Sequence, residues 1–203
     1  EVWKISDDGG EFFFKYPNNL QIAEDGSIFM TESKQFLKFS SDGKFLKNIY
    51  KKGQGPGEIG DYFTYYVHGR NLFVQDMNSQ RLWRTNFDGV FQEQIILKNK
   101  DYSGFLGVLP DGFLFLKSVW PPPGERTGKL MEILNTVVLV ARDGSEQRDI
   151  ATFKPKNFLF PQGAMGWDSA ITVPSPNAKL LYALHGRDYL IEVADLAEFG
   201  EPA

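Results

Sequence analysis

The residues best suited to contact a ligand lie in one proline-rich segment. Three consecutive prolines separate Trp120 from Gly124, and Arg126 follows two residues later. Proline fixes the backbone in an extended conformation, so such a segment loses little conformational entropy when it binds. Tryptophan and arginine are the residue types that contribute most to binding energy at interfaces. Trp120 and Arg126 are therefore candidate contacts for a partner; a tryptophan that covers the edge of the core is the alternative interpretation.

A second set of candidate contacts lies nearer the C-terminus. Trp167 stands between a glycine and an aspartate, and His185, Arg187 and Asp188 belong to the short segment His-Gly-Arg-Asp. Such a segment is typical of a turn, from which its side chains project together. We add these four residues to the candidate binding set. For residues 185–188 the alternative interpretation is a hairpin turn held by an arginine–aspartate pair, and for Trp167, as for Trp120, it is a tryptophan that covers the edge of the core.

The histidine and cysteine content restricts catalysis. The chain has two histidines, His68 and His185, and no cysteine. The absence of cysteine excludes disulfide bonds, thiolate zinc sites and cysteine nucleophiles, and two histidines argue against a multi-histidine metal site. A Ser-His-Asp triad would need His185 with Asp188 and a distant serine such as Ser169, and the sequence has no nucleophile elbow. We predict no catalytic residue and no cofactor.

Two further groups of residues are similar to known sites but lack their spacing. Asp61, Asp76 and Asn78 carry oxygens that calcium could bind, but their spacing is not diagnostic, and we predict no metal site. Residues 53–58, Gly-Gln-Gly-Pro-Gly-Glu, are rich in glycine, as phosphate-binding loops are. They lack the following Lys-Ser or Lys-Thr and precede a strand instead of a helix. We interpret them as a turn that needs a glycine at positive φ and is capped by Glu58.

Composition and charge argue against two classes of partner. The 203 residues are 42% hydrophobic and 24% charged, as in an ordinary globular protein. The formal net charge is -4, and the sequence lacks the cluster of Lys and Arg that phosphate contacts need. No apolar run approaches the ~20 residues of a membrane-spanning helix. We therefore expect no nucleic-acid partner and no transmembrane segment in this chain.

The candidate residues are separated by short strands that recur in a fixed order. The expected strands are residues 20–23, 27–31, 35–39 and 45–50 in the first copy, 64–67, 72–75, 81–85 and 91–97 in the second, 105–109, 113–118, 136–141 and 146–151 in the third, and 170–173, 179–184 and 189–193 in the fourth. The fourth copy lacks only its outer strand. Residues 2–5 form a separate strand-like run.

Asp-Gly dipeptides mark equivalent turns in these copies. They follow the first strand at residues 25–26 and 111–112, and the third strand at residues 42–43, 88–89 and 143–144. Four short strands per copy, with a period of about 40 to 50 residues, are typical of propeller blades. We predict an all-β chain, a β-propeller of four-stranded antiparallel blades with about four blades visible. A β-sandwich is the alternative.

The motifs of the first copy resemble those of a known family. Ser-Ile-Phe-Met, Phe-Leu-Lys-Phe, Ser-Asp-Gly-Lys-Phe-Leu and Gly-Gln-Gly-Pro-Gly-Glu follow one another within residues 27–58. This order resembles the NHL-repeat type of six-bladed propeller, and more narrowly the bacterial "6-bladed beta-propeller" proteins, which are usually exported or lipid-anchored. The resemblance covers most of residues 20–195 and is weak across residues 120–134. It implies an extracytoplasmic location: periplasmic, surface-anchored or secreted.

The number of blades has two interpretations. Six blades at this period would need about 260 residues, and four copies are visible. The resemblance favours a portion of a six-bladed propeller that is truncated at the C-terminus. In the alternative, residues 2–5 supply the outer strand of the fourth copy and close a four-bladed ring. In both cases we expect residues 1–203 to form a single propeller domain.

The long connections belong to one end of the expected blades. In a four-stranded meander, the connection between the second and third strands and the connection to the next blade emerge on the same side. Long loops at one end of a rigid scaffold usually carry binding function. The long connections are residues 51–61, 98–104, 119–134, 153–168 and 185–188.

We therefore predict a non-catalytic scaffold that binds a protein, a peptide or a glycan through this long-loop end. A propeller hydrolase or lyase with a central-channel carboxylate or calcium site is the first alternative. A structural fragment without an activity of its own is the second.

Overall fold

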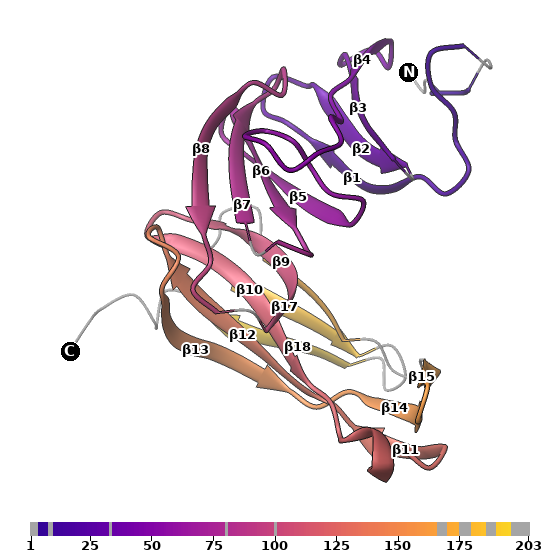
Figure 1. Ribbon diagram of the computed structural model, residues 1–203, viewed down its shortest axis with the longest axis vertical. Helices are drawn as coiled ribbons and strands as arrows, with labels where there is room; N and C mark the ends of the chain where they lie inside the picture. The colour runs from indigo at the N-terminus through magenta and orange to yellow at the C-terminus, as the bar shows by residue number, and fades with distance from the viewer. Residues whose placement is uncertain are drawn as a thin grey trace. The chain divides into compact units, whose positions relative to one another are not determined.

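The computed structural model describes residues 4–7, 10–32, 34–79, 81–99, 101–165, 170–174, 180–185 and 190–195. Contacts divide the chain into two compact units, Glu1–Leu97 and Lys98–Ala203. Each unit has hydrophobic clusters of its own. Both units consist of antiparallel sheets (Figure 1), and a short 3-10 helix is the one helical element among the described residues.

The first unit contains two four-stranded meanders in which consecutive strands lie side by side. The first meander consists of β1 (Asn18–Ile22), β2 (Ile28–Glu32), β3 (Gln35–Phe39) and β4 (Phe45–Asn48), and the second of β5 (Phe63–His68), β6 (Asn71–Asp76), β7 (Arg81–Asn86) and β8 (Phe91–Ile96). Gly43 and Gly89 occupy the turns after the third strands with φ of 81° and 74°, a conformation that favours glycine. The Asp-Gly dipeptides therefore mark these turns as predicted.

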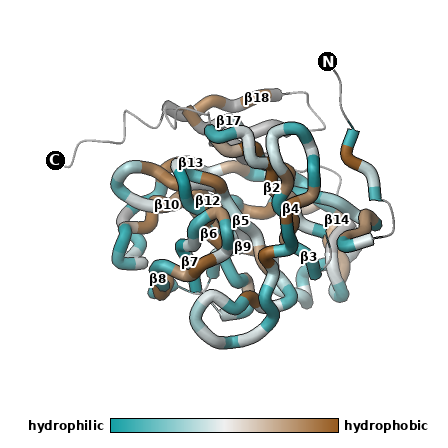
Figure 2. The backbone as a smooth tube through the Cα atoms, turned by 90° about the horizontal axis from the view of Figure 1, so that it is seen from above, coloured by the Kyte–Doolittle hydropathy of each residue, from teal (hydrophilic) through white to brown (hydrophobic). Residues whose placement is uncertain are grey.

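The first sheet buries its two faces against different partners. Neighbouring residues of a strand point to opposite faces, and the strands carry both hydrophobic and hydrophilic residues (Figure 2). On one face, Phe29 and Phe36 pack with Trp83 and other residues of the second sheet. On the other face, Leu37 packs with Phe12, which precedes β1 in the chain. Two adjacent sheets thus share a core, as stacked blades do.

A buried carboxylate fixes the segment that covers this second face, residues 10–17. Glu32 at the end of β2 is fully buried. Its Oε2 atom accepts the backbone N–H of Lys15 at 2.7 Å and that of Tyr16 at 2.5 Å. The side-chain amide of Gln35 donates to the carbonyl oxygen of Phe13 at 3.0 Å. Polar bonds thus hold the main chain of residues 10–17 while Phe12 fills the apolar face.

Side chains join the first strands of the two meanders, which belong to separate sheets. The Nε2 atom of Gln21 in β1 donates to the carbonyl oxygen of Tyr65 in β5 at 2.8 Å, and its Oε1 atom accepts the N–H of Val67 at 2.8 Å. The Tyr65 hydroxyl donates to the carbonyl oxygen of Asn19. Burial raises the pKa of Tyr65, so the phenol remains a donor at neutral pH.

The second unit contains a four-stranded and a three-stranded meander. Sheet order is β9, β10, β12, β13 in the first and β16, β17, β18 in the second, and β9 neighbours β16. Their bounds are β9 (Tyr102–Leu109), β10 (Gly112–Val119), β12 (Leu134–Ala141), β13 (Glu146–Phe153), β16 (Ala170–Pro174), β17 (Leu180–His185) and β18 (Leu190–Asp195). The first strands of the two meanders are therefore adjacent, as β1 and β5 are in the first unit.

A small sheet replaces two predicted long loops. β11 (Lys129–Glu132) pairs with β14 (Lys156–Phe160), and β14 pairs with β15 (Gly163–Met165). The 3-10 helix η1 (Pro123–Glu125) precedes β11. The prediction that residues 119–134 and 153–168 emerge at the same end is therefore confirmed. Their description as loops was wrong, because parts of both segments form strands.

The predicted fold class is confirmed: the chain is all-β and built from the four-stranded antiparallel blades of a propeller. The fourth copy has three strands among the described residues, as predicted. In the separate run at residues 2–5, Val2 and Trp3 lie outside the described residues, and Ile5 forms no strand but packs beside the cluster around Phe12. Among the described residues, no helix has the length and apolar character needed to cross a membrane.

Candidate ligand-binding site

The proline segment begins where a strand pair ends. β10 and β12 pair from Gly112 to Val119, and the last partners are Val119 and Leu134. Proline has no N–H to continue the ladder and holds the chain at a fixed φ, so the two chains diverge after this pair. Pro123 then starts η1, a position that proline favours because the first N–H of a helix has no partner. The prolines thus end the strand pairing, so that residues 120–125 do not pair with β11.

Arg126 is held against the proline segment by two contacts. Its Nε atom donates to the carbonyl oxygen of Pro121 at 2.6 Å. Its guanidinium carbon lies 5.8 Å from the centre of the Trp120 ring, within the range of a cation–π interaction. The structure therefore brings the two predicted contacts together, with Trp120 still 42% exposed.

A hollow of about 350 Å³ lies beside Trp120. Its apolar lining comes mainly from Trp120, Val119 and Leu134, three side chains that are exposed to solvent. Its charged lining consists of Glu125, Glu132 and Lys154. An apolar lining with a few charged groups is the usual composition of a ligand site. We refer to it as the Trp120 hollow.

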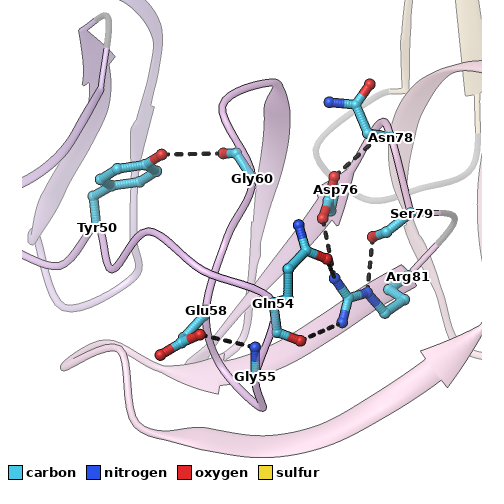
Figure 3. Close-up of polar contacts among 9 residues, drawn as sticks. All are labelled: Tyr50, Gln54, Gly55, Glu58, Gly60, Asp76, Asn78, Ser79 and Arg81. Atoms are coloured by element: carbon cyan, nitrogen blue, oxygen red, sulfur yellow. Dashed lines mark hydrogen bonds and ion pairs between the residues drawn. The ribbon is translucent and has the colours of Figure 1, made fainter.

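The glycine-rich loop of the first unit is a structural turn, as predicted (Figure 3). Gly57 has φ of 76°, and the carboxylate of Glu58 accepts the N–H of Gly55 at 2.8 Å. The N–H of Glu58 in turn donates to the carbonyl oxygen of Gly55 at 3.0 Å. The Glu58 carboxylate therefore accepts the N–H of Gly55, which an anion would otherwise bind. The two hydrogen bonds between Gly55 and Glu58 close the loop.

Arg81 anchors this loop to the second sheet. Its guanidinium donates to the carbonyl oxygen of Gln54 at 2.9 Å, to Ser79 Oγ at 2.8 Å and to Asp76 Oδ2 at 3.4 Å (Figure 3). Ser79 lies in the connection between β6 and β7. The glycine-rich loop and a second-to-third-strand connection therefore lie at the same end of the first unit, as predicted.

The three candidate calcium ligands line one small hollow of about 300 Å³ beside this loop. Asp61 forms an ion pair with Lys52 at 2.9 Å, and the buried carboxylate of Asp76 accepts the N–H of Asn78 at 3.0 Å. Within the described ranges, no group of three or more His, Cys, Asp or Glu side chains is arranged to hold a metal ion. The carboxylates of Asp61 and Asp76 thus already have partners in the protein.

The remaining predicted contacts cannot be placed at a site. Trp167, Arg187 and Asp188 lie outside the described residues. His185 is the last residue of β17, and its side chain is not among those described.

Sequence reasoning missed a polar cluster around Glu146 in the second unit. The Glu146 carboxylate accepts hydrogen bonds from Lys117 Nζ at 3.0 Å, Asn99 Nδ2 at 2.9 Å and the Tyr102 hydroxyl at 3.2 Å. Burial by itself raises the pKa of Glu146, but the bonds from Lys117 and Asn99 outweigh it and hold the pKa below the ordinary value of 4.5. Burial and the Glu146 charge raise the pKa of Tyr102. No sequence signal could have found this cluster, since its members come from three strands and a connection.

This cluster predicts a pH dependence of stability. Because the pKa of Glu146 is lower in the folded state, its ionised form stabilises the protein above the unfolded pKa of about 4.5, and this contribution is lost as the pH falls through the folded value. Glu146→Gln should therefore lower the free energy of unfolding at pH 7, and the difference from the wild type should shrink towards pH 3. Urea titrations at both pH values measure it; a difference that is equal at both would contradict the ion pair.

Comparisons with known proteins support the fold. The sequence matches no protein-family model and no curated protein. Its structure is similar to a putative exported protein from Bacteroides fragilis NCTC 9343, with 16% identity, coverage of 94% of this chain and 52% of that one, and a TM-score of 0.54. It is also similar to a DUF4221 family member from Bacteroides vulgatus ATCC 8482, with 10% identity, coverage of 92% and 59%, and a TM-score of 0.48. A third similar structure is streptogramin B lyase, with 10% identity, coverage of 89% and 83%, and a TM-score of 0.39.

These similarities concern part of the neighbouring proteins and their fold. The chain spans about half the length of the Bacteroides fragilis protein, which it covers to 52%. A TM-score of 0.54 at 16% identity shows a similarity of fold alone. The blades described above and this similarity together support a β-propeller fold for the chain.

Proposed function

We propose that this chain belongs to an NHL-like six-bladed propeller and acts as a non-catalytic scaffold that binds a protein, a peptide or a glycan at the Trp120 hollow. The observation that carries the proposal is an exposed tryptophan, held by Arg126 on a proline-stiffened segment, beside a hollow with a largely apolar lining. A rigid aromatic side chain loses little entropy on binding and offers a large contact area.

We also propose an extracytoplasmic location. It is supported by the sequence resemblance to exported bacterial propellers and by the structural similarity to a putative exported protein. The net charge of -4 supports a partner other than nucleic acid.

Trp120→Ala tests the proposed site. Arrays of synthetic peptides and glycans are probed with the labelled 203-residue chain, and Kd is then measured for the best ligands. We expect Trp120→Ala to weaken their binding by about 2 kcal/mol, or roughly 30-fold in Kd, because the aromatic anchor is lost. Arg126→Ala should weaken it less, because Arg126 acts partly by holding Trp120.

Tyr182→Ala is the matched control, since it removes an exposed aromatic side chain from another sheet of the same unit. Its binding profile should equal that of the wild type. Ligands that bind Trp120→Ala and the wild type equally would show that the hollow is not the binding site.

A further inference from the structure

One edge of the small sheet is left open by the proline segment. The sheet order is β11, β14, β15, so β11 is an edge strand. Its sequence continues directly into β12, whose first residue, Leu134, pairs with Val119 of β10. The chain that would continue this pairing alongside β11 is residues 121–123, three prolines without an N–H. A gap therefore replaces the strand that would otherwise lie there, and the Trp120 hollow is lined from both sides of this gap by Pro121, Pro122 and Glu132.

The backbone groups on this open edge can be assigned by alternation. Ile133 donates its N–H to the carbonyl oxygen of Pro155 at 2.9 Å, which is towards the β14 side. In an antiparallel pair, the N–H and C=O groups of successive residues point to opposite sides of the strand. The groups of Leu130 and Glu132 therefore point to the gap. Among the described residues, no strand pairs with this side of β11.

The charges of the residues at the gap favour a positively charged ligand. Two carboxylates, Glu125 and Glu132, and one ammonium group, Lys154, line the hollow. Within the described part of the chain, Glu125 forms neither an ion pair nor a side-chain hydrogen bond, whereas Glu132 has a distant partner in Lys156 at 3.8 Å. Arg126, whose guanidinium lies over the Trp120 ring and donates to the Pro121 carbonyl, is not among the residues that line the hollow. The residues that line the hollow thus carry one more negative than positive charge, which is complementary to a basic segment.

We propose that the Trp120 hollow binds an extended peptide with alternating apolar and basic residues, which adds to β11 as a further strand. Main-chain hydrogen bonds to Leu130 and Glu132 give the peptide its direction, an apolar side chain contacts Trp120 and Leu134, and a basic side chain lies near Glu125. Strand addition to an open edge is a general mode of peptide recognition. The inference rests on the proposed function, because it names the ligand class of the same hollow.

Backbone methylation of a probe peptide tests the strand addition. The probe is fluorescein-labelled acetyl-Lys-Leu-Lys-Leu-Lys-Leu-Lys-amide, and its binding to the full chain is measured by fluorescence anisotropy. Two further probes carry N-methyl groups on alternate residues, one on the lysines and one on the leucines. Because one edge of the added strand faces β11, one methylated probe should bind like the parent and the other at least about tenfold more weakly. A shift of register by one residue does not equalise them, since it turns every side chain to the other face.

Trp120→Ala and a glycan probe distinguish a wrong binding site from a wrong ligand class. Trp120→Ala should weaken the parent peptide, and Glu125→Gln should weaken it less and reduce its dependence on salt. Equal binding of both methylated probes, with a loss in Trp120→Ala, overturns strand addition and leaves the proposed site intact. Binding of chitohexaose without binding of the peptide, again lost in Trp120→Ala, overturns the peptide class and retains the site. Peptide binding that Trp120→Ala leaves unchanged overturns both.

Discussion

Gly112→Ala is expected to destabilise the second unit by about 3 kcal/mol, because a β-carbon at this position has no space. It would lie 2.2 Å from the carbonyl oxygen and 3.1 Å from the carbonyl carbon of Val140. Gly112 starts β10 and pairs with Leu109 on one side and Ala141 on the other. Relief of the clash therefore requires β10 or β12 to move, which breaks main-chain hydrogen bonds.

Urea titration followed by far-ultraviolet circular dichroism measures this loss. Gly124→Ala is the matched control in the same unit, since a β-carbon there meets nothing within 4 Å. Its free energy of unfolding should stay within about 0.5 kcal/mol of the wild type. Equal effects of the two substitutions would mean that β10 and β12 are less closely apposed than described.

Glu32→Ala is expected to release residues 10–17 and to cost about 2 kcal/mol. The substitution removes the acceptor of two backbone N–H groups, those of Lys15 and Tyr16, at a position that is closed to water. Glu32→Gln keeps one side-chain oxygen as an acceptor and should cost less. The apolar contacts of Phe12 persist in both variants, so the segment is expected to open locally before the sheet unfolds.

Limited trypsin digestion reports this opening, because the segment contains a cleavable bond after Lys15. The rate of cleavage at this bond should rise at least tenfold in Glu32→Ala and less in Glu32→Gln. Glu24→Ala, which removes an exposed carboxylate near β1, is the control and should leave the rate unchanged. An unchanged rate in Glu32→Ala would show that Phe12 alone holds the segment.

Local patterns predicted the strands well. The expected strand 35–39 agrees with β3, and the other expected strands of the first unit end within two residues of the described ones. The Asp-Gly dipeptides were informative because most of their glycines adopt positive φ, which few other residues tolerate. At residues 111–112 the dipeptide also marks the turn, but Gly112 is needed there for its close approach to Val140.

Contacts between distant segments could not be predicted. The pairing of β11 with β14 joins two short strands that lie about 25 residues apart, and in neither does the sequence alternate strongly between apolar and polar residues. The role of Glu32 depends on a partner segment 16 residues earlier. Trp120 and Arg126 could be named as candidates because their residue types and the prolines between them are distinctive. The edge of β11 beside them could not, because an open edge is a property of the sheet.

The link between β1 and β5 through Gln21 bears on how such chains grow by duplication. In the first unit, the strands of each blade pair only with one another, whereas the side-chain amide of Gln21 supplies two of the hydrogen bonds between the two blades. A copied blade would therefore bring its own ladder and would need to match its neighbour at few inner positions. The hydrogen bonds that fold a blade are therefore independent of the few that join it to the next blade. The number of blades can change without a change in the blade itself.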